Sequence, residues 1–154
     1  MSTKYATFAA GCFWGVEDKL AKIPGVLETR VGYTGGEVEN PTYRMVCTNQ
    51  TGHAEAVRVT YDPAQINYET LVRRFFEIHN PTTLNRQGPD IGSQYRSVVF
   101  YHTDEQHEIA ERVREELNQS DKFPHPIVTE IVPAEDFYEA EEYHQKYYAK
   151  NRYH

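Results

Sequence analysis

Apolar residues recur along this chain with two different periods, and each period predicts one kind of secondary structure. Short apolar runs and alternation with polar residues are typical of strands, and they occur at 5–10, 27–33, 54–61, 97–101 and 127–132. Apolar residues spaced three and four apart are typical of amphipathic helices, and they occur at 13–23, 68–76, 103–117 and, in a more polar form, 137–150.

Two long irregular stretches, 34–52 and 80–95, interrupt these elements, and the first holds one predicted helical turn near 43–47. Irregular loops above about 12–15 residues in a compact domain are usually functional or disordered. Both stretches contain aromatic and charged residues, which favours function.

The predicted order of elements is β-α-β-β-α-β-α-β-α. Its first six elements match the split β-α-β arrangement of ferredoxin-like folds. We therefore expect an α+β fold with a ferredoxin-like core, a mostly antiparallel sheet, helices largely on one face, and added C-terminal elements. A length of 154 residues suits one domain spanning 1–154.

Composition narrows the function classes. Sixteen Lys and Arg against 23 Asp and Glu give a net charge of −7, so nucleic acid is not an expected partner. We expect no membrane segment, because no run of 18 apolar residues occurs, and no signal peptide at the N-terminus. The two cysteines then point to a cytoplasmic, reducing setting. The seven histidines form no cluster with carboxylates or thiols, so no metal site is expected. A monomer is the default expectation.

Cys12 stands where the first strand meets the first helix, within the motif Gly-Cys-Phe-Trp-Gly. Helix N-termini favour anions, so we expect a lowered pKa and a nucleophilic thiolate at Cys12. Phe13 lies on the apolar face of this helix, and Trp14, one position round, is suited to wall a small apolar pocket. The alternative is that the thiol and both rings are ordinary core residues.

Glu55 begins the more apolar face of the strand at 54–61, which it shares with Val57, Val59 and Tyr61. Apolar surroundings raise the pKa of a carboxyl, and a carboxyl that stays protonated near neutral pH can act as a general acid. The alternative is that Glu55 reaches solvent at the strand end. A thiolate, an apolar wall and a neutral acid suit a sulfoxide, but a peroxide or an acyl group is also compatible.

Longer motifs decide between these substrates. The motif at 11–15 resembles the signature of the A-class peptide methionine sulfoxide reductases. The resemblance covers about residues 4–148, and further segments match that family in order and approximate spacing: 40–43, 46–47, 51–57, 61–63, 81–88, 90–97 and 142–145.

The resemblance implies two catalytic residues: Cys12 attacks the sulfur of the S epimer of methionine sulfoxide, and Glu55 protonates its oxygen. The substrate would be oxidised protein and, as an open alternative, free methionine sulfoxide. Cys12 would become a sulfenic acid. The resemblance also implies substrate-binding residues around the methyl group and the oxygen: Phe13, Trp14, Tyr43, Asp90 and Tyr95.

The chain departs from the family pattern in its last residues. Many members carry resolving cysteines in a Gly-rich tail, whereas the segment 150–154 has none. We therefore expect a one-Cys variant without a bound cofactor, regenerated by an external thiol such as thioredoxin, glutaredoxin or a small thiol. Cys47 is expected to be structural, although a disulfide with Cys12 would be feasible if their Cα atoms lay within about 7 Å. A thiol peroxidase or redox sensor, and a non-catalytic module that binds oxidised peptides, remain alternatives.

Overall fold

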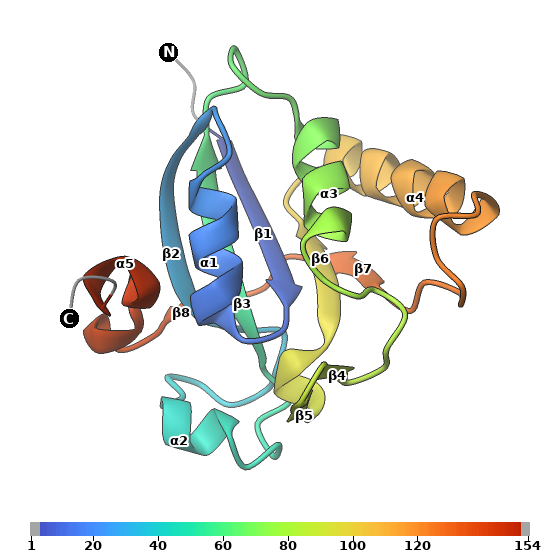
Figure 1. Ribbon diagram of the computed structural model, residues 1–154. Coiled ribbons are helices and arrows are strands. Elements are labelled where there is room, and N and C mark those ends of the chain that lie inside the picture. Colours follow the sequence, from blue (N-terminus) through green and yellow to red (C-terminus); the bar gives the residue numbers. More distant parts are fainter. Residues whose placement is uncertain (1–3, 152–154) are drawn as a thin grey trace.

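The computed structural model describes residues 4–151 (Figure 1). The expectations about the N-terminal start and the cysteine-free tail rest partly on residues 1–3 and 152–154, which lie outside the described residues. Six strands of the described chain form one sheet in the order β7-β6-β1-β3-β2-β8. These strands are β1 Lys4–Ala10, β2 Val26–Thr34, β3 Ala54–Tyr61, β6 Ser97–Tyr101, β7 Glu130–Pro133 and β8 Tyr138–Glu139.

Every pair in this sheet is antiparallel except β6 with β7, so the expected mixed architecture with a mostly antiparallel sheet is confirmed. β3 lies between β1 and β2, and β1 lies between β3 and β6. The two strands that flank β3 are therefore connected through α1, which crosses over the sheet between them (Figure 1). Within residues 4–151, no helix has both the length and the apolar character needed to cross a membrane.

Three longer helices follow the predicted periodicity: α1 Phe13–Ala21, α3 Tyr68–Glu77 and α4 Asp104–Gln119. The side chain of Asn67 accepts a hydrogen bond from the backbone N–H of Thr70 at 2.8 Å, which caps α3. Thr103 caps α4 through the N–H of Gln106. The side chain of Gln106 in turn accepts a hydrogen bond from the backbone N–H of His102 at 2.8 Å.

The alternation along β3 separates two apolar layers. Val57, Val59 and Tyr61 belong to the main core, which the three helices cover. Ala54 and Ala56 face the other side, in a smaller apolar cluster covered by the segment 132–137. Glu55 lies on the same face as Val57, so the predicted period of two places its carboxyl on the helix side of the sheet.

The prediction of a helix over 137–150 is wrong. The segment instead forms β8, a 3₁₀ turn η2 Glu142–His144, and the short helix α5 Tyr147–Asn151. The side chain of Gln145 exchanges hydrogen bonds with the backbone N–H and C=O of Val31 on β2. Lys146 has a positive φ of 54°, which interrupts a helix. Tertiary contacts to β2 therefore replace the polar helix that local pattern favours.

The two long loops contain short elements. The predicted helical turn is α2 Tyr43–Val46. The stretch 80–95, predicted as irregular, holds a small hairpin of β4 Arg86–Gln87 and β5 Asp90–Ile91, followed by the 3₁₀ turn η1 Ser93–Tyr95. Figure 1 shows that α2, this hairpin and η1 gather at the lower end of the sheet, where α1 and β3 begin.

Candidate active site

Cys12 follows the last residue of β1 by two positions and occupies the N-cap position of α1, where its side chain makes no capping hydrogen bond. Gly11 makes this sharp turn with φ = 104°, in the region that favours glycine. A Cβ added at Gly11 would lie 2.9 Å from the Cγ of Gln87, so the hairpin β4–β5 also packs directly on this glycine. The half-buried Cys12 is thus held between the start of α1 and the hairpin.

The expected lowering of the Cys12 pKa is wrong. Burial raises the pKa of the thiol to about 11, and the nearby carboxyls of Glu55 and Asp90 raise it further. The backbone N–H groups of Trp14 and Gly15 do lower it, as a helix start should, but burial outweighs them. In the substrate-free protein, Cys12 is therefore a thiol at neutral pH.

Glu55 is 1% exposed on β3 and accepts a hydrogen bond through Oε1 from the backbone N–H of Phe13 at 3.2 Å. Its other oxygen, Oε2, is buried without a hydrogen-bond partner among residues 4–151. Burial raises the pKa of this carboxyl to about 8, against the smaller effect of the Phe13 N–H. The expected rise is confirmed, and Glu55 is mostly protonated at pH 7.

Asp90 and Tyr95 reach the same site from the second long loop. The charge of Asp90 raises the pKa of Cys12, of Glu55 and of Tyr95, so Asp90 lies within electrostatic reach of all three. Burial raises the pKa of the Tyr95 hydroxyl to about 12, with further contributions from Glu55, Cys47 and Cys12. Both residues are half-buried, as groups that meet a ligand from solvent need to be.

Tyr43 begins α2 in the first long loop. Burial raises the pKa of its hydroxyl well above the usual value, and a hydrogen bond with the Cys47 thiol contributes. Cys47 itself is exposed, and both Cys12 and Cys47 are free thiols. The two loops therefore bring Tyr43, Cys47 and Tyr95 to the end of the sheet where Cys12 and Glu55 lie.

Phe13 and Trp14 take different positions. Phe13 is 1% exposed and packs among the rings of Tyr33, Tyr43 and His144. Trp14 is half-buried, and its Nε1–H donates to Nδ1 of His144 at 2.9 Å. Trp14 thus offers more surface to a ligand, whereas Phe13 mainly supports the site from the core.

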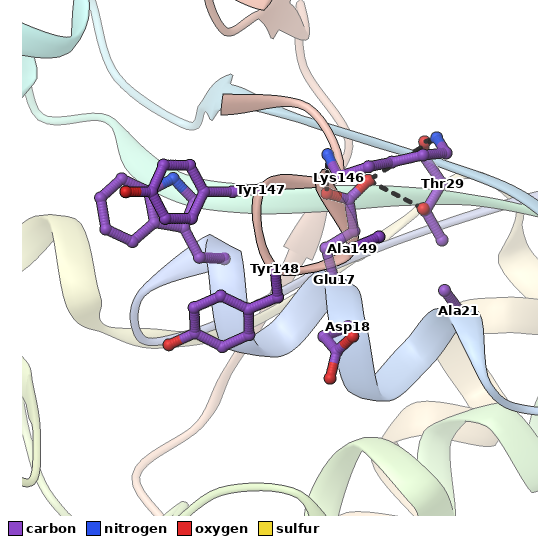
Figure 2. Close-up of a pocket in the computed structure, with 9 residues that line it drawn as sticks. Glu17, Asp18, Ala21, Thr29, Lys146, Tyr147, Tyr148 and Ala149 are labelled. Atoms are coloured by element: carbon purple, nitrogen blue, oxygen red, sulfur yellow. Dashed lines mark hydrogen bonds and ion pairs between the residues drawn. The ribbon is translucent and has the colours of Figure 1, made fainter. Parts of the chain in front are cut away.

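The C-terminal segment, for which the sequence suggested no role, builds the outer wall of the site. Tyr147 stacks on Trp14 with ring centroids 3.8 Å apart (Figure 2). The buried carboxylate of Glu17 accepts from the Thr29 hydroxyl at 2.8 Å and from the backbone N–H of Lys146 at 2.7 Å. A small cavity of about 70 Å³ lies between these groups, α1 and α5.

Glu141 ties the same segment to two tyrosines. Its Oε1 accepts from the Tyr33 hydroxyl at 2.8 Å, and its Oε2 accepts from the backbone N–H of Tyr43 at 3.0 Å. Sequence reasoning missed Glu17, Glu141 and His144 as contributors to the site. The family match at 142–145 was a signal for His144 alone, because Glu17 and Glu141 are polar residues that lie outside the matched segments. Among residues 4–151, no group of three His, Cys, Asp or Glu side chains is arranged to hold a metal ion.

Comparison with known proteins gives consistent matches over nearly the whole chain. The family model described as "Peptide methionine sulfoxide reductase" matches residues 4–154. Peptide methionine sulfoxide reductase MsrA of Methanoculleus marisnigri is 60% identical over 149 residues, covering 97% of this chain and 91% of that protein. MsrA of Methanothermobacter thermautotrophicus is 62% identical over 146 residues, covering 95% of this chain and 86% of that protein.

Solved structures agree with these sequence matches. Mxr1 from Saccharomyces cerevisiae in reduced form has a TM-score of 0.92 and 40% identity, covering 99% of this chain and 87% of that one. The same yeast protein in complex with Trx2 has a TM-score of 0.68 and 32% identity, covering 94% and 84%.

The chain therefore belongs to the peptide methionine sulfoxide reductase family and is an oxidoreductase. Within that family it is of the A class, since its relatives at 60% and 62% identity carry the name MsrA. The resemblance seen in the motifs is confirmed at the level of the family.

Proposed function

We propose that this enzyme reduces the S epimer of methionine sulfoxide, in peptides and as the free amino acid, through attack of Cys12 on sulfur. The observation that carries the proposal is the buried carboxyl of Glu55 in the site of the Cys12 thiol: its Oε2 has no hydrogen-bond partner among residues 4–151, and burial raises its pKa to about 8. A neutral acid beside a sulfur nucleophile is the pair that a sulfoxide needs, because its oxygen leaves only when it is protonated. A peroxide substrate does not require an apolar wall such as the one that Trp14 offers to the methyl group of a sulfoxide.

The chemistry balances without a free thiolate in the resting protein. Glu55 gives its proton to the sulfoxide oxygen and takes the proton of Cys12 as the sulfur–sulfur contact forms. The hydroxyl then moves from the substrate sulfur to the Cys12 sulfur: the S–O bond of the substrate and the transient sulfur–sulfur bond break, and a new S–O bond makes Cys12 a sulfenic acid. Two electrons pass from Cys12 to the substrate sulfur, and the product is methionine. This relay explains how a thiol with a raised pKa can react at neutral pH.

The remaining site residues hold the substrate. Trp14, backed by Phe13, contacts the methyl group, since an indole face offers apolar surface without a hydrogen-bonding demand there. The hydroxyls of Tyr43 and Tyr95 donate hydrogen bonds to the oxygen, and their raised pKa values keep them protonated as donors. Asp90 orders the site and, by its charge, helps keep Glu55 protonated.

An external thiol completes the cycle. It attacks the sulfenic acid of Cys12 and releases water, and a second thiol then reduces the mixed disulfide. The yeast relative Mxr1 has been solved in complex with Trx2, which supports a thioredoxin-type reductant here. Glutaredoxin or a small thiol would serve the same chemistry. A supply of thiols implies a reducing compartment such as the cytoplasm. Cys47 then stays outside the cycle, as in a one-Cys enzyme, and no resident cofactor is required.

The proposal extends to the architecture and the oligomeric state of the enzyme. We assign residues 1–154 to one domain that acts as a monomer, with β6, β1, β3 and β2 as a ferredoxin-like split β-α-β core. The strand order and the crossover through α1 support that assignment.

The decisive experiment is turnover with dithiothreitol on the two separated epimers of blocked methionine sulfoxide. We expect methionine release from the S epimer alone, and none from a Cys12→Ser variant. Turnover of the R epimer at a comparable rate would overturn the stereochemical proposal. Residual activity near wild type in Cys12→Ser would remove Cys12 as the nucleophile.

A further inference from the structure

The hairpin β4–β5 carries two unusually exposed aliphatic side chains. Leu84 is 68% exposed and Ile91 is 67% exposed. The backbone N–H of Gly92 donates to the C=O of Asn85 at 2.9 Å, and each of the two aliphatic residues adjoins one end of this bond. Across the hairpin Ile91 pairs with Arg86, so Leu84 and Ile91 stand diagonally on either side of the bond between Asn85 and Gly92, and we call them the apolar pair.

The apolar pair adjoins the candidate active site. Ile91 directly follows Asp90, whose charge acts on Cys12. Gln87 in the same hairpin packs on Gly11, the residue before Cys12. Because the hairpin packs against the residue before Cys12, the polypeptide on one side of an oxidised methionine at Cys12 would lie over the hairpin.

Other exposed apolar side chains also lie around this end of the molecule. Met45 is 38% exposed on α2, and Tyr143 is 59% exposed on η2, next to His144. Single exposed apolar residues are normal, but apolar side chains grouped around a site mark a surface for a partner. Free methionine sulfoxide is too small to reach from Cys12 beyond the hairpin, so its binding does not account for the pair.

We propose that Leu84 and Ile91 form a docking surface for the polypeptide on either side of the oxidised methionine, and that they favour apolar neighbours. The occupant is an extended peptide segment with aliphatic or aromatic side chains, such as an unfolded stretch of oxidised core. This inference rests on the proposed function, because it assigns the substrate class that the Cys12 site prefers.

The test compares three substrates that carry the same reacting group. They are a blocked Leu-Met(O)-Leu peptide, a blocked Ser-Met(O)-Ser peptide, and blocked methionine sulfoxide without neighbours, all as the S epimer. Burying part of a leucine side chain on the apolar pair should raise kcat/KM by about 5- to 10-fold for the Leu peptide over the Ser peptide. The gain should appear in KM, since the contact is equal in the ground and transition states.

The variant is the double substitution Leu84→Ser with Ile91→Ser, both at exposed positions where the fold loses little packing. We expect the preference for the Leu peptide to shrink to less than about twofold, while turnover of blocked methionine sulfoxide stays within about twofold of wild type. The matched control is Leu27→Ser, which should retain the full preference. Leu27 is 51% exposed near the start of β2, at the end of the sheet away from the hairpin β4–β5 (Figure 1).

A preference that persists in the double variant overturns the inference, as does an equal loss on all three substrates. Melting temperatures of the variants check that the hairpin substitution leaves the fold intact. Absence of turnover on every substrate by the wild type would overturn the proposed function and this inference with it. Normal turnover with no preference for the Leu peptide would overturn this inference alone.

Discussion

Replacing Glu55 by Gln tests two consequences of burying a carboxyl beside Cys12: the delivery of a proton to the substrate and a loss of stability of the fold. The amide has the same size and keeps an oxygen to accept the Phe13 N–H, so the local geometry survives. It cannot deliver a proton to the sulfoxide oxygen, so we expect kcat to fall by about 10²- to 10⁴-fold, the usual contribution of a general acid. That loss corresponds to about 3–5 kcal/mol of transition-state stabilisation.

The same substitution should stabilise the fold, and the structure sets the size of the effect. The pKa of Glu55 rises from 4.5 to about 8 on folding. A raised carboxyl pKa means that the folded state binds more protons than the unfolded state between these two values. The contribution of Glu55 therefore leaves the free energy of unfolding of the wild type highest below pH 4.5 and lowers it as the pH rises to 8. pH 7 lies about 2.5 pH units above the unfolded pKa of this carboxyl. At about 1.36 kcal/mol per unit, burial of Glu55 lowers the free energy of unfolding by roughly 3 kcal/mol.

The variant should therefore unfold at a higher temperature than wild type at pH 7, with a difference that grows from pH 4.5 to 8 and vanishes below. Thermal unfolding followed by circular dichroism at pH 4, 6 and 8 measures it. A Glu55→Gln enzyme that is no more stable at pH 8 than at pH 4, relative to wild type, would refute the burial argument. Turnover within a few-fold of wild type would refute the role as acid.

A third readout concerns the nucleophile. The ionised Glu55 raises the pKa of Cys12, so the neutral amide should lower that pKa at alkaline pH. The rate of alkylation by iodoacetamide against pH reports it, in a Cys47→Ser background so that one thiol reacts. A thiol that ionises more easily in an enzyme that turns over more slowly would assign the defect to proton delivery.

Two further variants test the surroundings of the site. Cys47→Ser should keep turnover with dithiothreitol within about twofold of wild type, because an external thiol regenerates Cys12; a collapse in the steady-state rate would show that Cys47 takes part in recycling or holds the site. Glu17→Ala leaves the Thr29 hydroxyl and the Lys146 N–H without their acceptor, which should cost about 1–3 kcal/mol in urea unfolding. It should also red-shift the emission of Trp14, the only tryptophan. Glu28→Ala, at an exposed position on β2, is the control, and equal effects of both substitutions would contradict a specific anchor at Glu17.

Local pattern predicted the elements whose stability is local. The apolar face of α3 appears in the structure as the spacing indicates, because it depends on residues three or four positions apart. The alternation that placed Glu55 on the face of Val57 also held, since a strand exposes successive side chains on opposite sides. The raised pKa of Glu55 followed from that placement.

The polar C-terminal stretch could not be predicted in this way. Its residues form β8, the 3₁₀ turn η2 and the short helix α5, because Glu141 and Gln145 bond to β2 and to Tyr43, more than 90 positions away in the chain. A helical pattern among polar residues carries no information about such partners. The hairpin β4–β5 is similar, because two-residue strands give no periodic signal.

The sequence by itself determined the family and the position of Cys12 at a helix start, and through the family resemblance it predicted Glu55, Asp90 and Tyr95, which the structure brings near Cys12. Only the tertiary structure decided the ionisation of that thiol. The helix start lowers its pKa through two adjacent N–H groups, which are local and visible in the motif. Burial, Glu55 and Asp90 raise it more, and these come from the packing of β3 and the hairpin around the sulfur. Desolvation depends on everything that surrounds a group in space, so neighbours along the chain do not determine its outcome.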